Sequence, residues 1–237
     1  MQRKTLTAVI VTGASVAAMT MNTMAWAHGD VAPQAVDTSA LPTLEEGDWL
    51  LENPWRDPEG ENWAAAVKVG ASGYNQNCAR CHGLEAISGG LAPDLRYLEA
   101  DEFGDEWFLE RFRHGYTQNG ITKMPAFGDL LGQEAAWAIR TYIETRPDDG
   151  ALDDHDDRLH DILGELQAMN GQGGEGANAA LDEYREELKT IAAEVGTASG
   201  APRADSVASR AAAALDGSEK NLDETVEILT IGLSAAQ

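Results

Sequence analysis

The chain has 237 residues, 43% of them hydrophobic, and a formal net charge of −23 at pH 7 from 40 acidic and 17 basic residues. This balance excludes nucleic acid as a partner, because phosphate binding needs clustered Lys and Arg. The acidic excess runs through the whole chain, so it predicts solubility or salt adaptation more strongly than it predicts steering toward a basic partner protein.

The N-terminus has the pattern of an export signal. A short basic start precedes an apolar stretch, and Ala25-Trp26-Ala27 matches an A-x-A cleavage site. The apolar stretch is too short to predict a membrane anchor, and no later segment is apolar enough to span a bilayer. We therefore predict a signal peptide over residues 1–27, cleaved after Ala27, and a soluble periplasmic mature chain that starts at His28.

Residues 28–62 are rich in Pro, Asp, Glu and Gly and show no sustained hydrophobic period. They predict an irregular N-terminal arm. Its tryptophans, Trp49 and Trp55, are expected to press onto the following domain together with Trp63.

A helix is predicted from Trp63 onward, because apolar residues recur at three- and four-residue steps and lead into Cys78. The run Cys78-Ala79-Arg80-Cys81-His82 is a C-x-x-C-H motif. Two thiols at this spacing add across the vinyl groups of a haem, and the next residue offers an imidazole to the iron. The alternatives are a redox dithiol and half of a zinc site. A zinc site needs two more soft ligands, yet the chain has no other Cys, and a thioredoxin-like dithiol needs a βαβ pattern. One motif predicts one haem.

The segments beyond the motif alternate between loops and helices. A loop rich in Gly and Pro spans residues 88–94, and the carbonyl of Pro93 is expected to accept the Nδ1–H of His82 and hold one tautomer. A helix is predicted from about 105 to 114, followed by a polar turn and a loop that holds Met124. Another helix is predicted from 133 to about 145, and it stops before Pro147.

Met124 is the candidate for the second axial ligand of the iron. Without the signal peptide the chain retains only Met124 and Met169, and Pro125-Ala126-Phe127 stiffens the loop and supplies an apolar wall. A lone Met is otherwise usually core filler. The rival ligand is His114, but His is common near helix C-termini, which favours a surface role. Imidazole and thioether together fill both axial positions, which suits electron transfer rather than substrate chemistry.

An acidic linker begins at Asp148. Beyond it, helices are predicted at about 158–169, 177–195, 204–215 and 222–233, with Gly-rich breaks between some of them. Apolar stripes at helical spacing predict a small bundle or a helix pair packed on the haem domain, and a partner-docking surface is the less favoured alternative.

These residues resemble the class I cytochromes c. Gly70-x-x-x-Tyr74-x-x-x-Cys78 matches the Gly/aromatic spacing of the family's first helix, and Ile139-x-x-Tyr142 matches the pair on its last helix, where the two helices cross. The resemblance implies an all-α fold with three main helices around one covalently attached haem c. It implies these site residues: Cys78 and Cys81 as thioethers, His82 and Met124 as axial ligands of the haem iron, and Pro93 as the carbonyl beside His82.

Longer strings resemble the periplasmic c-550 group, which accepts electrons from PQQ-dependent (quinoprotein) ethanol dehydrogenases. They are residues 28–37, 74–86, 89–96, 104–108 and 133–140. The group's pattern ends near the third helix, so the last part of the chain departs from it. We therefore divide the chain into a signal peptide (1–27), an arm (28–62), a cytochrome c domain (63–147) and an acidic helical extension (148–237).

The resemblance implies a periplasmic mono-haem electron carrier and not an enzyme. One electron would enter from a quinoprotein alcohol dehydrogenase and leave to an oxidase or another cytochrome of the respiratory chain. The alternative is a general periplasmic carrier to a terminal oxidase or reductase, without a dedicated dehydrogenase. A di-haem peroxidase needs a second attachment motif, which is absent from the sequence. A tethering role for the C-terminal helices also remains open.

Overall fold

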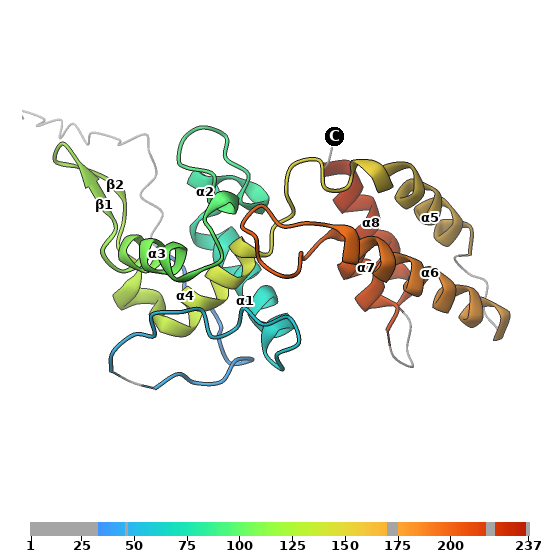
Figure 1. The fold of residues 1–237 in the computed structure, drawn as a ribbon, viewed down its shortest axis with the longest axis horizontal. Helices are drawn as coiled ribbons and strands as arrows, with labels where there is room; N and C mark the ends of the chain where they lie inside the picture. The colour runs from blue at the N-terminus through green and yellow to red at the C-terminus, as the bar shows by residue number, and fades with distance from the viewer. Residues whose placement is uncertain (1–32, 46, 170–174, 217–220, 236–237) are drawn as a thin grey trace, which may run out of the picture. The chain divides into compact units, whose positions relative to one another are not determined.

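The computed structural model describes residues 33–45, 47–169, 175–216 and 221–235 (Figure 1). The predicted signal peptide, and with it the cleavage site after Ala27, lies outside the described residues. Within the described ranges most residues are helical, and the only sheet has two short strands. This is the mostly helical architecture that the cytochrome c resemblance implied, and no described helix is long and apolar enough to cross a membrane.

After the arm, the first half of the described chain forms four α-helices and a two-stranded hairpin, which Figure 1 shows together. Their bounds are α1 (Trp63–Asn77), α2 (Ala79–His82), α3 (Glu102–His114), β1 (Tyr116–Gln118), β2 (Ile121–Met124) and α4 (Gly128–Glu144), with the 3-10 turns η1 (Leu84–Ala86) and η2 (Leu95–Tyr97).

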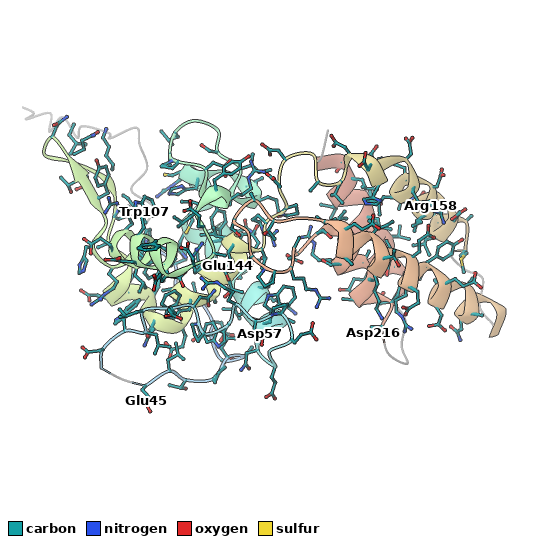
Figure 2. The ribbon with its side chains drawn as sticks, viewed as in Figure 1. Glu45, Asp57, Trp107, Glu144, Arg158 and Asp216 are labelled. Atoms are coloured by element: carbon teal, nitrogen blue, oxygen red, sulfur yellow. The ribbon has the colours of Figure 1, made fainter. Side chains whose placement is uncertain are left out.

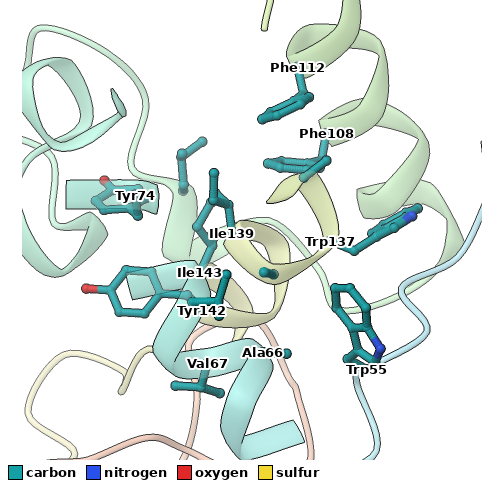
Figure 3. Close-up of a cluster of buried hydrophobic side chains, with 14 of the residues drawn as sticks. Trp55, Ala66, Val67, Tyr74, Phe108, Phe112, Trp137, Ile139, Tyr142 and Ile143 are labelled. Atoms are coloured by element: carbon teal, nitrogen blue, oxygen red, sulfur yellow. The ribbon is translucent and has the colours of Figure 1, made fainter. Parts of the chain in front are cut away.

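Gly70 allows α1 to cross α4 at close range. An ideal Cβ on Gly70 would lie 1.9 Å from the carbonyl oxygen of Ala138, so any side chain there forces the two helices apart. The rings of Tyr74 and Tyr142 pack beside the crossing with their centroids 5.2 Å apart. Ile139 is fully buried next to them (Figure 3). The crossing is the one that the family resemblance implied.

The helix α3 begins three residues before its expected start at about residue 105. The Asp101 side chain accepts a hydrogen bond of 2.9 Å from the Gly104 N–H and caps the helix at that point. The helix α4 contains a break at Gly132, where φ is +76°. Its main part therefore starts at Gln133, as the sequence predicted.

A β-hairpin occupies residues 116–124, where the sequence analysis expected only a polar turn and a loop. Gln118 pairs with Ile121 and Tyr116 pairs with Met124. The two linking residues, Asn119 and Gly120, have φ values of +52° and +74°. An Asn-Gly pair favours a two-residue hairpin loop of this kind. Met124 therefore ends a strand instead of lying in an irregular loop.

The arm is irregular in its described part and packs on the helices as expected. Trp55 is buried, and the ring of Trp49 lies 6.2 Å from that of Phe112. Backbone N–H groups of the arm also reach α4: Leu44 donates to the Glu134 carboxylate over 2.9 Å. The arm thus covers one side of the main apolar cluster (Figure 3).

A buried charge cluster, which the sequence analysis missed, fixes the arm to α3 and α4. Arg56 lies 2.7 Å from Asp105 and 3.1 Å from Glu144, and Arg140 lies 2.8 Å from Asp105. Burial raises the pKa of Glu144, because it outweighs the attraction of Arg140 and Arg56. Removing one member of such a cluster leaves an uncompensated buried charge, which is strongly destabilising.

The helices of the extension surround an apolar cluster of their own. They are η3 (Asp153–His155), α5 (Asp156–Met169), α6 (Glu175–Glu194), α7 (Val207–Ala214) and α8 (Leu222–Ala235). The α-helices begin and end within three residues of their expected positions. α7 packs on α6 and α8, and α5 packs on α8, with Leu159, Leu188 and Leu229 fully buried. Charged side chains such as Arg158 and Asp216 lie on the outside of these helices (Figure 2). The domain boundary at 147/148 stays a prediction.

Candidate haem site

The two cysteines of the motif lie on one turn of helix at the end of α1. The N–H groups of Cys81 and His82 both donate to the carbonyl of Cys78, over 3.0 Å each. Residues three apart on a helical turn share a face, so the two thiols point to the same side. Both are free and half-buried. Burial raises the pKa of the Cys78 thiol to about 12, with Cys81 adding to the effect, so this thiol is neutral.

Gly83 turns the chain sharply after the motif. Its φ is +85°, and an ideal Cβ would lie 1.8 Å from the carbonyl oxygen of Ile87, so no other residue fits. The Tyr74 hydroxyl donates a hydrogen bond of 2.9 Å to the carbonyl of Gly83. Burial raises the pKa of Tyr74, which keeps this phenol protonated. From the sequence, Tyr74 was expected only at the helix crossing, and Gly83 was not among the expected site residues.

His82 is buried, and its Nδ1 lies 2.9 Å from the carbonyl oxygen of Pro93. A carbonyl can only accept, so Nδ1 carries a proton, and in the neutral ring Nε2 then keeps a free lone pair. An imidazole in this state is ready to bind a metal through Nε2. The contact lies where the sequence led us to expect it, and its role toward the iron stays a prediction.

The loop that carries Pro93 is held by Asp94 and Arg96. The Asp94 carboxylate accepts hydrogen bonds from the N–H groups of Ser88 and Arg96, over 3.3 and 3.0 Å. The Arg96 guanidinium lies 2.9 Å from Asp94 and 2.7 Å from Asp149 at the start of the extension. These bonds fix the position of the Pro93 carbonyl relative to His82.

Met124 lies on a different element from the motif, at the end of strand β2. It is half-buried and packs against the same apolar cluster as Cys78. The Phe127 N–H donates to the carbonyl of Phe112 over 2.8 Å, and this bond holds the segment that follows Met124 against α3. Gly115 makes room for it, since an ideal Cβ there would lie 2.5 Å from the Met124 carbonyl oxygen. The rival ligand, His114, is exposed, with Nε2 3.9 Å from Glu110.

The chemistry of these side chains fits a covalent haem. The donor set is two free thiols on one face, an imidazole with its Nε2 free, and a half-buried thioether. Three apolar side chains in the segment that follows the motif are exposed on the polypeptide: Leu84 by 73%, Ile87 by 51% and Leu91 by 76%. Exposed apolar side chains suit contact with the apolar face of a porphyrin. In the described ranges no group of three or more His, Cys, Asp and Glu residues is placed to hold a bare metal ion.

Comparison with known proteins extends this picture. A family model described as cytochrome c oxidase, cbb3-type, subunit III matches residues 65–143. The chain is 53% identical to cytochrome c550 of Pseudomonas aeruginosa over 129 residues, which is 54% of this chain and 88% of that protein. No solved structure gives a significant match.

Two longer proteins contain a similar segment. Quinohemoprotein alcohol dehydrogenase ADH-IIG of Pseudomonas putida is 34% identical over 94 residues, which is 40% of this chain and 12% of that protein. The cbb3-type cytochrome c oxidase subunit FixP of Rhizobium meliloti is 30% identical over 91 residues, which is 33% of this chain and 29% of that subunit. The chain therefore spans only a small part of either protein.

Proposed function

Because the chain belongs to the class I c-type cytochromes, with one covalent haem c and an electron-transfer role rather than an enzymatic one, we propose that it takes electrons from a PQQ-dependent alcohol dehydrogenase in the periplasm. The bound haem supplies an iron that gains and loses a single electron. The respiratory chain, through a terminal oxidase or another cytochrome, then receives that electron.

We assign the site residues as follows. Cys78 and Cys81 form the thioethers, His82 is one axial ligand of the iron and Met124 is the other. The Pro93 carbonyl holds the His82 ring in one orientation and one tautomer, and this contact is the observation that best supports the assignment. Met124 closes the second axial position, so small molecules cannot reach the iron without displacing it.

The similarity to a quinohemoprotein alcohol dehydrogenase supports the proposed donor. In that Pseudomonas putida protein, a segment similar to this chain belongs to the same polypeptide as the remainder of the dehydrogenase. A separate chain of the same kind can serve a dehydrogenase that lacks such a segment. The strings at residues 74–86 and 89–96, which resemble the c-550 group, point the same way.

The cbb3-type similarity supports the alternative function. FixP is named as a subunit of a cbb3-type cytochrome c oxidase, and the family model is described as subunit III of such an oxidase. A general carrier that delivers electrons to such an oxidase, without a dedicated dehydrogenase, would show the same likeness. The proposed donor is what separates the two functions.

Stopped-flow reduction tests the donor directly. The oxidised full-length protein is mixed with a quinoprotein alcohol dehydrogenase that has been reduced by ethanol, and the dehydrogenase without alcohol serves as control. We expect rapid reduction through a small, transient contact. A second assay follows oxidation of the reduced protein by a cbb3-type oxidase. If the oxidase oxidises the protein but the dehydrogenase does not reduce it, the function as a general carrier is favoured.

The same measurement across ionic strengths tests the acidic surface. Salt weakens steering by opposite charge, because at 0.1 M it largely screens charges that are more than about 10 Å apart. A rate that falls with salt means that basic residues on the donor recognise this chain. A constant rate means that the net charge of −23 serves solubility.

The periplasmic location has its own test. We expect the haem-loaded protein in the periplasmic fraction, with an N-terminal sequence that starts at His28. A cytoplasmic location, or a mature chain that retains residues 1–27, contradicts the proposed export.

A further inference from the structure

The segment 196–206, which joins α6 to α7, is bonded to the end of α4 although it belongs to the extension. Pro147 and Thr197 form an antiparallel bridge, and beside it the Ala198 N–H donates to the carbonyl of Arg146 over 3.3 Å. On its other side, the Ser199 carbonyl accepts a bond of 3.0 Å from the Ala100 N–H. The segment thus lies between the end of α4 and the start of α3.

The same segment caps α4. The last carbonyls of a helix have no partner inside the helix and need one elsewhere when they are buried. The Ser199 hydroxyl donates to the carbonyl of Glu144, over 2.5 Å, and the Asp205 N–H donates to that of Thr145, over 2.9 Å. Glu144 and Thr145 are both buried, so water cannot replace these donors without opening the structure.

Arg146 connects this cap to the haem-attachment motif. Its guanidinium is fully buried, lies 4.0 Å from the ring centroid of Tyr142 and forms ion pairs with two carboxylates. One is Asp205 of the extension and the other is Glu85, three residues after His82. Burial alone would lower the pKa of Arg146, but Asp205, Tyr142 and Glu85 together raise it, so the side chain stays cationic.

Glu85 lies in a strained turn. Glu85 and Ala86 have φ values of +54° and +62°, which non-glycine residues rarely adopt. Such a conformation persists only where surrounding contacts impose it. On one side the turn follows Gly83, whose carbonyl is held by Tyr74. On the other side the Arg146–Glu85 pair holds it.

We propose that segment 196–206 of the extension functions as part of the haem domain. Arg146 is a positioning residue in this proposal, and through it Asp205 holds the Gly83–Ile87 turn beside the haem. The turn carries the backbone that leaves the attachment motif, so its rigidity limits the access of water to that side of the haem. This role is separate from the choice of electron donor, and its tests do not use electron transfer.

Amide hydrogen exchange on the full-length, haem-loaded protein tests the link. In Asp205→Asn, we expect exchange of the hydrogen-bonded amides of Gly83 and Ile87 to accelerate by about tenfold or more, the scale of one lost hydrogen bond to a charged group. Exchange in the middle of α1 should change far less. Equal acceleration in α1 and in the turn, or acceleration confined to segment 196–206, overturns the proposal.

A reciprocal variant gives an independent readout. Glu85 is half-exposed, so Glu85→Gln leaves the fold intact. If Arg146 couples both carboxylates, this change must also accelerate exchange at the Asp205 amide, because coupling between two sites is reciprocal. The matched control is Asp216→Asn, which removes an exposed partner of Arg185 in the same extension. It should alter neither region. An unaffected Asp205 amide in Glu85→Gln overturns the coupling.

The haem midpoint potential separates positioning from a simple charge effect. Removing a nearby negative charge disfavours the oxidised, more positive state and raises the potential. A loosened turn admits water, favours the oxidised state and lowers the potential. We expect a lower potential in both Asp205→Asn and Glu85→Gln, and no change in Asp216→Asn. An unchanged or raised potential in the first two variants overturns the action on the haem.

Discussion

The Nδ1 atom of His82 lies 2.9 Å from the carbonyl oxygen of Pro93, eleven residues further along the chain. A ring held in this way would bind the iron of a haem through Nε2, which leaves one further ligand to be supplied by another residue. Met124, half-buried beside the same apolar cluster as Cys78, is our candidate for that ligand.

Met124→Ala should remove the weak thioether-to-iron absorption at the red end of the visible spectrum and lower the midpoint potential substantially. Axial-ligand identity is one of the main controls over a range of about 0.8 V. Visible spectra and a redox titration provide the measurement. Met169→Ala, in the apolar cluster of the extension, is the control and should change neither. If the wild type lacks the band, and the spectrum and potential survive in Met124→Ala but change in His114→Ala, His114 is the ligand.

Asp94→Asn should reduce stability by about 1 kcal/mol at neutral pH. Burial alone would raise the pKa of Asp94, but the hydrogen bonds from Arg96 and Ser88 outweigh it and lower the pKa below the ordinary value of 3.8. A lowered pKa stabilises the fold above the ordinary value, and the contribution is lost as the pH falls through the folded-state pKa.

Urea unfolding of wild type and Asp94→Asn between pH 7 and pH 3 measures this effect. The difference between the two proteins should be constant near neutrality and shrink once the pH drops below about 4. The other carboxylates titrate in both proteins, so their contributions cancel in the difference between the two unfolding free energies. A difference that grows toward low pH contradicts the assigned ion pair with Arg96.

Gly70→Ala should cost several kcal/mol, or prevent recovery of the haem-loaded protein, because its Cβ would lie 1.9 Å from the Ala138 carbonyl. Thermal unfolding followed by circular dichroism provides the measurement. Gly164→Ala is the control: in the middle of α5 its Cβ meets no atom within 4 Å. Alanine is the better helix former, so Gly164→Ala should stabilise by up to about 1 kcal/mol. Similar effects at both positions would mean that α1 and α4 do not cross closely.

Removing residues 148–237 tests the predicted domain boundary. The truncated chain keeps the proposed haem ligands and the helix-crossing residues, so we expect a normal haem spectrum. The end of α4 loses the donors from Ser199 and Asp205, so the melting temperature should fall by several degrees. Loss of the haem would show that the extension is part of the core and that the boundary at 147/148 is wrong.

Local sequence signals predicted much of the site. The spacing of Cys78, Cys81 and His82 is a property of a single helical turn, and it needs no knowledge of the remaining fold. The hairpin also had a local signal, the Asn119-Gly120 pair with Thr117 before it and Ile121 and Thr122 after it, although only a polar turn was expected there. Each of these signals depends on only a few neighbouring residues, so it can be recognised from the sequence alone.

The buried charges could not be predicted in this way. Arg56 and Glu144 are 88 residues apart, and charged residues lie on the surface in most proteins. The sequence therefore predicts Asp105 to be an ordinary first residue of a helix, although it is fully buried between Arg56 and Arg140. The Arg146 ion pairs join segments 61 and 59 residues apart, and only the folded chain brings them together.

If Met124 binds the haem iron as proposed, the β-hairpin gives Met124 and His82 different rates of release from the iron. The side chains of its strands are exposed before Met124, and the strands are held by their pairing and by the Arg111 guanidinium, which lies over the Tyr116 ring. Opening such a hairpin exposes little apolar surface, so it can occur by local fluctuation without unfolding the helices. The Cys78–His82 turn cannot open in this way once thioethers fix it. We therefore expect exchange of the Met124 ligand for small external ligands such as imidazole to proceed at the rate of hairpin opening, far faster than global unfolding.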